Sequence, residues 1–229
     1  MQIKGLQKLT LLDYPERTAC TVFLGGCNLR CPFCHNASLV IPEKFGESIP
    51  EDEFFAFLSS RVGKLEGVCI SGGEPTLYRD LANFIKRIKD MGFLVKLDTN
   101  GTNPDMLESL ISSNLVDYVA MDIKSSLDDY ASAVGISDFD TSSIEKSVAV
   151  LRRGDVDFEF RTTVVLGLHT EENLLKIAKW LEGEKKYFLQ TFEDSGDVIK
   201  NGFSGYSKAE MQCILEAVQK FIPLAQIRN

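Results

Sequence analysis

Short, continuously apolar segments alternate along the chain with longer segments whose apolar residues recur every three or four positions. Continuous apolar runs of strand length are typical of parallel strands that are covered on both faces of a sheet. Such strands are predicted at residues 18–24, 67–71, 93–98, 116–122, 156–165 and 187–191. The pattern therefore indicates a buried, parallel sheet.

The segments between these strands carry apolar stripes of helical period. Helices are predicted at residues 51–58, 80–91, 104–111, 143–151, 171–181 and 208–221. Strands that alternate with helices imply right-handed crossovers between parallel neighbours. A closed barrel of eight such units needs about 250 residues, more than this chain has. We therefore predict an α/β fold, an open, partial (β/α)6 TIM-like barrel with parallel strands.

Composition and charge narrow the class of protein. The chain of 229 residues is 44% hydrophobic and 25% charged, and it shows no repeat or linker, so a single domain over residues 1–229 is predicted. Its net charge of -8, with Lys and Arg spread along the sequence, disfavours nucleic acid as a partner. We expect no membrane association and a cytoplasmic location, because the chain has neither a bilayer-long apolar run nor a secretory signal.

The cysteines fall into two groups. Cys20, Cys69 and Cys213 lie in apolar surroundings, and we expect them to be small buried side chains. The other three, Cys27, Cys31 and Cys34, lie within eight residues of one another. Such crowding indicates a metal site rather than three disulfides.

The crowded cysteines follow the first predicted strand, so they occupy a loop at the end of the sheet where barrel active sites gather. Three thiolates can bind three irons of a [4Fe-4S] cluster, whereas closed electron-transfer clusters use four cysteines. The alternative is a structural zinc site made of the same cysteines and His35. Two observations disfavour zinc: His35 directly follows Cys34, and a chain with an ample core does not need a metal to fold.

The spacing C-x-x-x-C-x-x-C in this loop resembles that of the radical S-adenosylmethionine (SAM) superfamily. Residues 71–75, Ser-Gly-Gly-Glu-Pro, end the second predicted strand and resemble the superfamily's GGEP motif. The resemblance implies that Cys27, Cys31 and Cys34 are the catalytic ligands of a [4Fe-4S] cluster, and that SAM chelates its remaining iron. It also implies a radical SAM oxidoreductase, in which one electron cleaves SAM and the resulting 5′-deoxyadenosyl radical abstracts a hydrogen atom.

The resemblance further implies a SAM pocket. Its residues would be Phe33, Cys34, His35, Gly72, Gly73, Glu74, Asp122, Ile123, Lys124, Ser125, Ser126, Leu127 and Arg161. An alternative for Arg161 is an exposed arginine at a strand edge. One family feature is missing, since Gln190 stands near the position where a histidine contacts adenosine in the pyruvate formate-lyase activating enzyme.

Two strand-end segments, residues 97–101 and 120–124, carry aspartates, which by themselves could simply cap the following helices. Together they resemble segments of the pyruvate formate-lyase activating enzyme and its relatives, where two aspartates, a threonine and a carbonyl hold a monovalent cation. The matching ligands are Asp98, Thr99, Asp122 and the carbonyl of Ala120. The resemblance therefore implies Na⁺ or K⁺ beside SAM, and oxygen ligands suit such hard cations.

The opening, residues 5–15, and the triplet Cys34-His35-Asn36 resemble the long-form activating components of anaerobic ribonucleoside-triphosphate reductase. The resemblance covers nearly the whole chain and is weakest after residue 190. It implies an activase that makes a glycyl radical on a partner enzyme, which we expect to be an anaerobic ribonucleotide reductase. The expected electron donor is a flavodoxin or ferredoxin.

Two alternatives stay open. The same chemistry could serve another glycyl radical enzyme, such as pyruvate formate-lyase, or a small molecule. An alternative from another class is a non-catalytic zinc or iron–sulfur binding module. Acid–base catalysis is not required for hydrogen abstraction, and the chain has only two histidines, His35 and His169.

Overall fold

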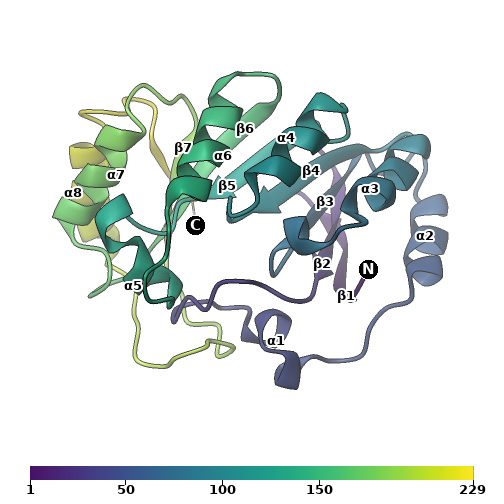
Figure 1. Ribbon diagram of the computed structural model, residues 1–229, viewed down its shortest axis with the longest axis horizontal. Coiled ribbons are helices and arrows are strands. Elements are labelled where there is room, and N and C mark those ends of the chain that lie inside the picture. The colour runs from purple at the N-terminus through teal and green to yellow at the C-terminus, as the bar shows by residue number, and fades with distance from the viewer. Residues whose placement is uncertain (229) are drawn as a thin grey trace. The chain divides into compact units, whose positions relative to one another are not determined.

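All six predicted strands are present in the structure, a computed structural model that describes residues 1–228 (Figure 1). They are β2 (Ala19–Leu24), β3 (Gly67–Gly72), β4 (Leu94–Thr99), β5 (Tyr118–Asp122), β6 (Asp157–Val164) and β7 (Tyr187–Thr191). Strands β2 to β5 are buried along most of their length, as their continuous apolar sequences predict. Two further strands, β1 (Ile3–Thr10) and β8 (Gln226–Arg228), were not predicted.

The strands are hydrogen-bonded in sequence order, from β1 to β8. Strand β1 runs antiparallel to β2, whereas β2–β3, β3–β4, β6–β7 and β7–β8 are parallel pairs. Within residues 1–228 this order does not continue from β8 back to β1. The predicted α/β fold with an open, mostly parallel sheet is therefore confirmed, with two more strands than expected.

The helices agree closely with the apolar periodicity. They are α2 (Glu51–Ser59), α3 (Leu81–Asp90), α4 (Pro104–Ser112), α6 (Ser142–Arg152), α7 (Glu171–Trp180) and α8 (Lys208–Val218). The side chains of Thr170 and Ser207 cap the first turns of α7 and α8. Shorter elements lie in the loops: α1 (Ala37–Val40), α5 (Tyr130–Val134) and the 3-10 turns η1 (Pro42–Lys44), η2 (Pro75–Leu77) and η3 (Leu127–Asp129). These are too short for a periodicity to be recognised.

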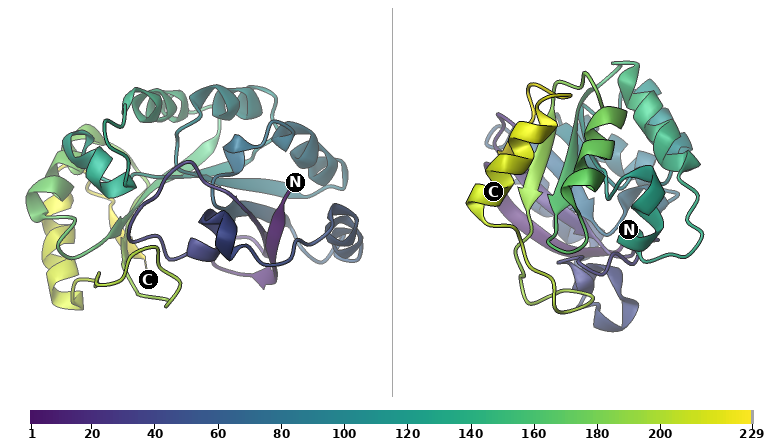
Figure 2. Two further views of the ribbon diagram at one scale, coloured as in Figure 1. Left: turned by 60° about the horizontal axis from the view of Figure 1, so that its bottom comes forward. Right: turned by 90° about the vertical axis from the view of Figure 1, so that its left-hand side faces the viewer.

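The chain divides into two compact units, each assembled from separate segments. The first contains Met1–Asn28, Asn36–Ala120 and Ser143–Asp157. The second contains Leu29–His35, Met121–Ser142 and the chain from Phe158 onward. In the second unit α7 and α8 lie side by side, and α8 packs beside β8 (Figure 2). The single domain over residues 1–229 stays a prediction.

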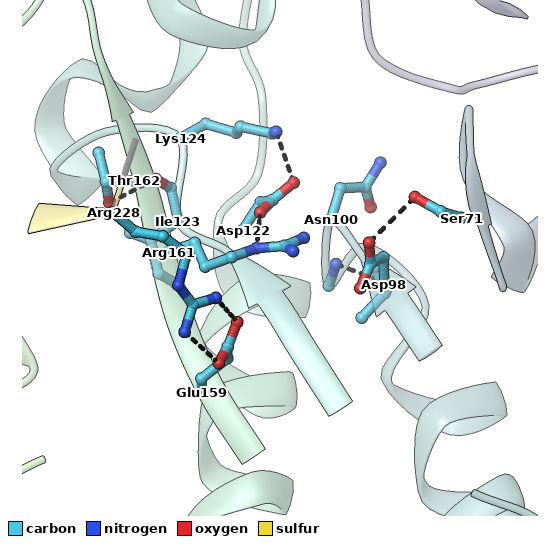
Figure 3. Close-up of polar contacts among 12 residues, drawn as sticks. Ser71, Asp98, Asn100, Asp122, Ile123, Lys124, Glu159, Arg161, Thr162 and Arg228 are labelled. Atoms are coloured by element: carbon cyan, nitrogen blue, oxygen red, sulfur yellow. Dashed lines mark hydrogen bonds and ion pairs between the residues drawn. The ribbon is translucent and has the colours of Figure 1, made fainter. Parts of the chain in front are cut away.

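Strand β8 is fixed by an ion pair inside the second unit. Arg228 donates to both oxygens of the buried Glu159 on β6, at 2.6 and 3.0 Å (Figure 3). Its guanidinium also lies 3.5 Å from the ring centroid of Phe188. A charged strand of this kind carries no apolar run, which explains why the sequence pattern missed it.

Two of the three cysteines expected in the core are there. Cys20 and Cys69 are buried, but Cys213 is exposed on α8, so that prediction was wrong for Cys213. Its neighbours Met211 and Ile214 are buried, because they lie on a different face of the helix. In the described part of the chain, no helix is both long and apolar enough to cross a membrane.

Candidate active site

The loops that follow β2 and β3 touch through main-chain atoms in the first unit. The amide of Gly73 donates to the carbonyl of Leu24 and that of Glu74 to the carbonyl of Gly26, both at 2.8 Å. A Cβ on Gly73 would lie 1.9 Å from the carbonyl oxygen of Gly26. A Cβ on Gly72, which has φ +121°, would lie 2.3 Å from the carbonyl oxygen of Leu24. The two glycines therefore let the β3 loop lie directly against the residues that precede Cys27.

Glu74 fastens this loop to the end of β4. The carboxylate is fully buried, and Oε1 accepts hydrogen bonds from the amide and hydroxyl of Thr76 and the hydroxyl of Thr99. Oε2 accepts from the amide of Asn100 at 2.6 Å. Burial raises the pKa of Glu74, while these four donors act in the opposite direction by favouring the carboxylate. Glu74 thus connects the β3 loop to the end of β4, and its place in the SAM pocket stays a prediction.

Asn100 reaches the first cysteine and was missed by the sequence reasoning. Its side-chain amide lies 3.7 Å from the sulfur of Cys27 and 3.1 Å from Oδ1 of Asn28. Hydrogen bonds to thiolate sulfur are one way in which a protein tunes an iron–sulfur cluster. The signal was present, because Asn100 directly follows the predicted ligands Asp98 and Thr99.

The other two cysteines form a tight turn in the second unit. The amide of Cys34 donates to the carbonyl of Cys31 at 2.9 Å. Main-chain bonds hold both sides of this turn, from Ile199 to the carbonyl of Cys34 and from Lys200 to that of Pro32. Cys31 is buried and Cys34 is half-buried. Cys27 belongs to the first unit, and neither unit by itself gathers three His, Cys, Asp or Glu side chains as a metal site in the described residues.

Two cations flank Asp122 at the end of β5. Its Oδ1 accepts from Nε of Arg161 at 2.9 Å and its Oδ2 from Nζ of Lys124 at 3.1 Å (Figure 3). Burial alone would raise the pKa of Asp122, but the two cations outweigh it and hold the pKa below its usual range. Arg161 is thus a partner of Asp122, and its side chain is only 13% exposed, so the alternative of an exposed arginine at a strand edge is wrong.

The ammonium of Lys124 acts on the cysteines as well. Burial would lower its pKa, but Asp122 and the thiols of Cys31 and Cys34 raise it above its usual value. The same interaction favours the thiolate form of both cysteines, which is the form that binds metal. The second unit therefore places two cysteine sulfurs near the positive charge of Lys124.

His169 links two of the predicted pocket residues. Its Nδ1 accepts from the amide of Val165 at 3.1 Å, so the ring proton is on Nε2, which donates to the carbonyl of Lys124 at 2.7 Å. Its ring also meets the Phe33 ring edge to face, with centroids 5.9 Å apart. Burial lowers the pKa of His169 and keeps it neutral. Sequence reasoning set this histidine aside because no acid–base step required it.

The segment after Lys124 is held by one asparagine. Nδ2 of Asn173 lies 2.9 Å from the hydroxyl oxygens of Ser125 and Ser126. Both serines are buried, and Leu127 begins the turn η3 directly after them. Ile123 is buried in front of them, with its carbonyl accepting from the hydroxyl of Thr162 at 2.8 Å. The predicted Asp122–Leu127 segment therefore leads from the end of β5 to η3 and is held by these hydrogen bonds.

The remaining predicted residues differ in exposure. The side chain of His35 is exposed, while its carbonyl accepts from the hydroxyl of Ser195 at 3.2 Å. Gln190, which stands near the position of the missing family histidine, is half-buried on β7.

The predicted cation ligands are already engaged by protein groups. Asp98 pairs through Oδ1 with the ammonium of Lys96. Its Oδ2 accepts from the hydroxyl of Ser71 at 3.0 Å (Figure 3). The hydroxyl of Thr99 donates to Glu74 and accepts from the amide of Gly101. Ala120 is buried in β5, and Asp122 carries the two cations described above. This donor set fits Na⁺ or K⁺ poorly, and the cation stays a prediction.

Known proteins share sequence similarity with most of this chain. The family model of the Radical SAM superfamily matches residues 21–181. A protein of Methanocaldococcus jannaschii, provisionally named a glycyl-radical enzyme activating enzyme, is 37% identical over 198 residues, which are 83% of this chain and 80% of the relative. A 7-carboxy-7-deazaguanine synthase of Methanospirillum hungatei JF-1 is 30% identical over 159 residues, 67% of this chain and 62% of that protein.

A solved structure shows the same fold. Streptococcus suis SuiB bound to S-adenosylmethionine aligns with a TM-score of 0.66 at 16% sequence identity. The alignment covers 91% of this chain and 52% of the SuiB chain. This chain thus spans about half the length of that structural relative.

Proposed function

This chain belongs to the radical SAM superfamily, and we propose that it is the activating enzyme of a glycyl radical enzyme. Membership of the superfamily implies a [4Fe-4S] cluster and SAM as cofactors. The observation that carries the proposal is the 37% identity to the Methanocaldococcus jannaschii relative over most of both chains. The opening at residues 5–15 also resembles the long-form activases of anaerobic ribonucleotide reductase.

The cluster would be held by Cys27, Cys31 and Cys34. When bound, such a cluster supplies the electron that cleaves SAM and so yields the 5′-deoxyadenosyl radical. The chain's own groups suit these ligands, because Asn100 lies beside the sulfur of Cys27 and Lys124 favours the thiolates of Cys31 and Cys34. Three thiolates within eight residues leave one iron of a cube without a cysteine, where a fourth cysteine would have closed the site.

The residues proposed to bind SAM lie in loops and at strand ends of the chain. Gly72 and Gly73 would offer main chain to the amino group, since no side chain intervenes there. The two positive charges of Lys124 and Arg161 exceed the single negative charge of Asp122, so these side chains would face an anionic group. Phe33 is held by the ring of His169 and excludes water from its side of the pocket. These residues position and shield the reactants and perform no proton transfer.

The partner is proposed to be an anaerobic ribonucleotide reductase, with a flavodoxin or ferredoxin as electron donor and the cytoplasm as location. Support comes from the resemblance of residues 5–15 and of Cys34-His35-Asn36 to activases of that enzyme. A second candidate function, radical chemistry on a small molecule, is favoured by the 30% identity to the 7-carboxy-7-deazaguanine synthase. A glycyl radical enzyme of the pyruvate formate-lyase type is the alternative partner.

The class of chemistry is tested by SAM cleavage. The protein is reconstituted with iron and sulfide under anaerobic conditions, reduced with dithionite and assayed for 5′-deoxyadenosine. Wild type should form it, and Cys31→Ala should lose it completely because one iron loses its ligand. Cys213→Ala is the matched control, since this cysteine is exposed on α8, and it should retain full activity.

Two results would contradict the proposal. The first is 5′-deoxyadenosine formation that survives in Cys31→Ala. The second is its absence from wild type that carries a full, reduced cluster. Metal analysis separates the binding-module alternative, because zinc without iron or sulfide in the purified protein would favour a structural site.

A further inference from the structure

A lysine is buried in the middle of β4, which is an unusual place for this residue. The side chain of Lys96 is 1% exposed. Lysine is almost never fully buried unless its charge is paired. The neighbouring strand places Cys69 opposite Lys96, and Asp98 lies two residues further along the same face of β4.

The ammonium of Lys96 is paired with Asp98. Its Nζ contacts Oδ1 of Asp98 and lies 3.8 Å from the sulfur of Cys69. The other oxygen of Asp98 accepts from Ser71 Oγ at 3.0 Å (Figure 3). Asp98 is therefore a carboxylate whose charge is balanced by a cation that belongs to the chain itself.

The arrangement leaves little electrostatic reason for a metal ion at Asp98. A monovalent ion bound to this carboxylate would lie next to the Lys96 ammonium and be repelled by it. Asp122, the second carboxylate of the predicted cation site, is paired in its own unit with Arg161 and Lys124. Asp98 in the first unit thus has Lys96 as its cation partner, and Asp122 in the second unit has Arg161 and Lys124.

We propose that Lys96 supplies, as a built-in ammonium, the positive charge for which Na⁺ or K⁺ was predicted, and that the protein has no monovalent cation site. The ammonium carries the same single charge as these ions and is anchored by its own strand. The inference rests on the proposed function only where it gives the site at Asp98 a role in that function. The ion pair between Lys96 and Asp98 does not depend on what the protein does.

The test is cation-specific stabilisation of the full chain, which requires no SAM cleavage. Thermal unfolding is measured anaerobically in KCl or NaCl, replaced stepwise by tetramethylammonium chloride at constant ionic strength. Wild type should show the same Tm in all three salts. Lys96→Met should show a saturable increase with K⁺ or Na⁺, roughly 3–6 °C at ten times Kd, because the metal ion now takes the vacated place at Asp98.

A matched control is Lys89→Met, which removes a second lysine of the same unit that is paired with an aspartate and is 25% exposed. Lys89 donates to both oxygens of Asp117, at 2.6 and 2.7 Å, away from the predicted site. This variant should gain no cation-specific increase. An equal increase in Lys89→Met would show that any unpaired aspartate binds cations, and would overturn the assignment to Lys96.

The remaining outcomes also decide the matter. A saturable, cation-specific increase in wild type would overturn the proposal, as would a folded Lys96→Met variant without one. If Lys96→Met does not fold, the wild-type titration decides by itself, with a flat Tm supporting the built-in cation. Failure of wild type to form 5′-deoxyadenosine would refute the proposed function and leave this result unchanged.

Discussion

The buried polar side chains of this protein hold main-chain atoms of the loops that carry the proposed site. Glu74 accepts a hydrogen bond from the amide of Asn100, and the hydroxyl of Ser147 donates to the carbonyl of Gly101 at 2.7 Å. His169 holds Lys124, a residue 45 positions away in the sequence. The motif residues could be recognised from the sequence, but these partners could not, because each bond joins segments that only the fold brings together.

His169 makes the stability of the protein depend on pH. Burial, and secondarily the charge of Lys124, lowers its pKa below the usual 6.5. The unfolded chain therefore binds a proton at a pH where the folded chain does not. The stabilisation is complete above the unfolded pKa and decreases as the pH falls below it, by at most about 1.4 kcal/mol per pH unit. Urea unfolding at a series of pH values measures this slope.

The control for this prediction is His169→Gln, which cannot titrate. His35 is unchanged in both proteins, so the difference between their slopes belongs to His169 alone. The slope should be smaller in the variant between about pH 6.5 and the folded pKa. Identical slopes in the two proteins would show that His169 has the same proton affinity in the folded and the unfolded chain.

At the scale of elements, the sequence predicted the strands and helices that have long apolar patterns. The six buried strands and six amphipathic helices follow from hydrophobic periods that extend over whole elements. Strand β1 was missed because it lies at the edge of the sheet, where its burial is uneven and its pairing with β2 is irregular. Strand β8 has three residues and α5 has five, too few for either period to show.

The close approach of the β3 loop to the β2 loop gives a prediction at this scale. In Gly73→Ala the added Cβ would lie 1.9 Å from the carbonyl oxygen of Gly26, so one of the two loops must move. We expect a loss of about 1–3 kcal/mol in unfolding free energy, typical of overpacking, together with loss of 5′-deoxyadenosine formation. Urea unfolding and the SAM cleavage assay measure the two effects.

Gly46→Ala is the matched control for this substitution. A Cβ at Gly46 would meet no atom within 4 Å, and its backbone is not in the left-handed region. It should therefore keep both the stability and the activity of wild type. If Gly73→Ala behaves like Gly46→Ala in both measurements, the contact between the two loops does not support the site.

At the scale of the whole molecule, the division into two units runs through the cysteine motif itself. Cys27 lies in the segment Met1–Asn28 of the first unit, whereas residues 29–35 belong with the later strands of the second. Long-range bonds cause this division, for example from the amide of Arg30 to the carbonyl of Val134 at 2.9 Å. The sequence predicted one continuous domain, because no linker or change in composition marks the boundaries.

The identity of the hydrogen donor is a property of the whole protein and its partner, and it gives the last prediction. Reduced, cluster-loaded protein is mixed with SAM and either an anaerobic ribonucleotide reductase or a pyruvate formate-lyase, and glycyl radicals are counted by EPR. We expect a radical on the ribonucleotide reductase, because the opening of this chain resembles activases of that enzyme. The Cys31→Ala variant, unable to cleave SAM, should produce none.

Isotope transfer makes this experiment specific for direct abstraction. If the partner carries α-deuterated glycine, the 5′-deoxyadenosine must gain deuterium as the glycyl radical appears, since the same hydrogen leaves one molecule and enters the other. A radical on pyruvate formate-lyase alone would replace the proposed partner and keep the activase function. Cleavage of SAM with no radical or deuterium transfer from either enzyme would instead favour a small molecule as hydrogen donor.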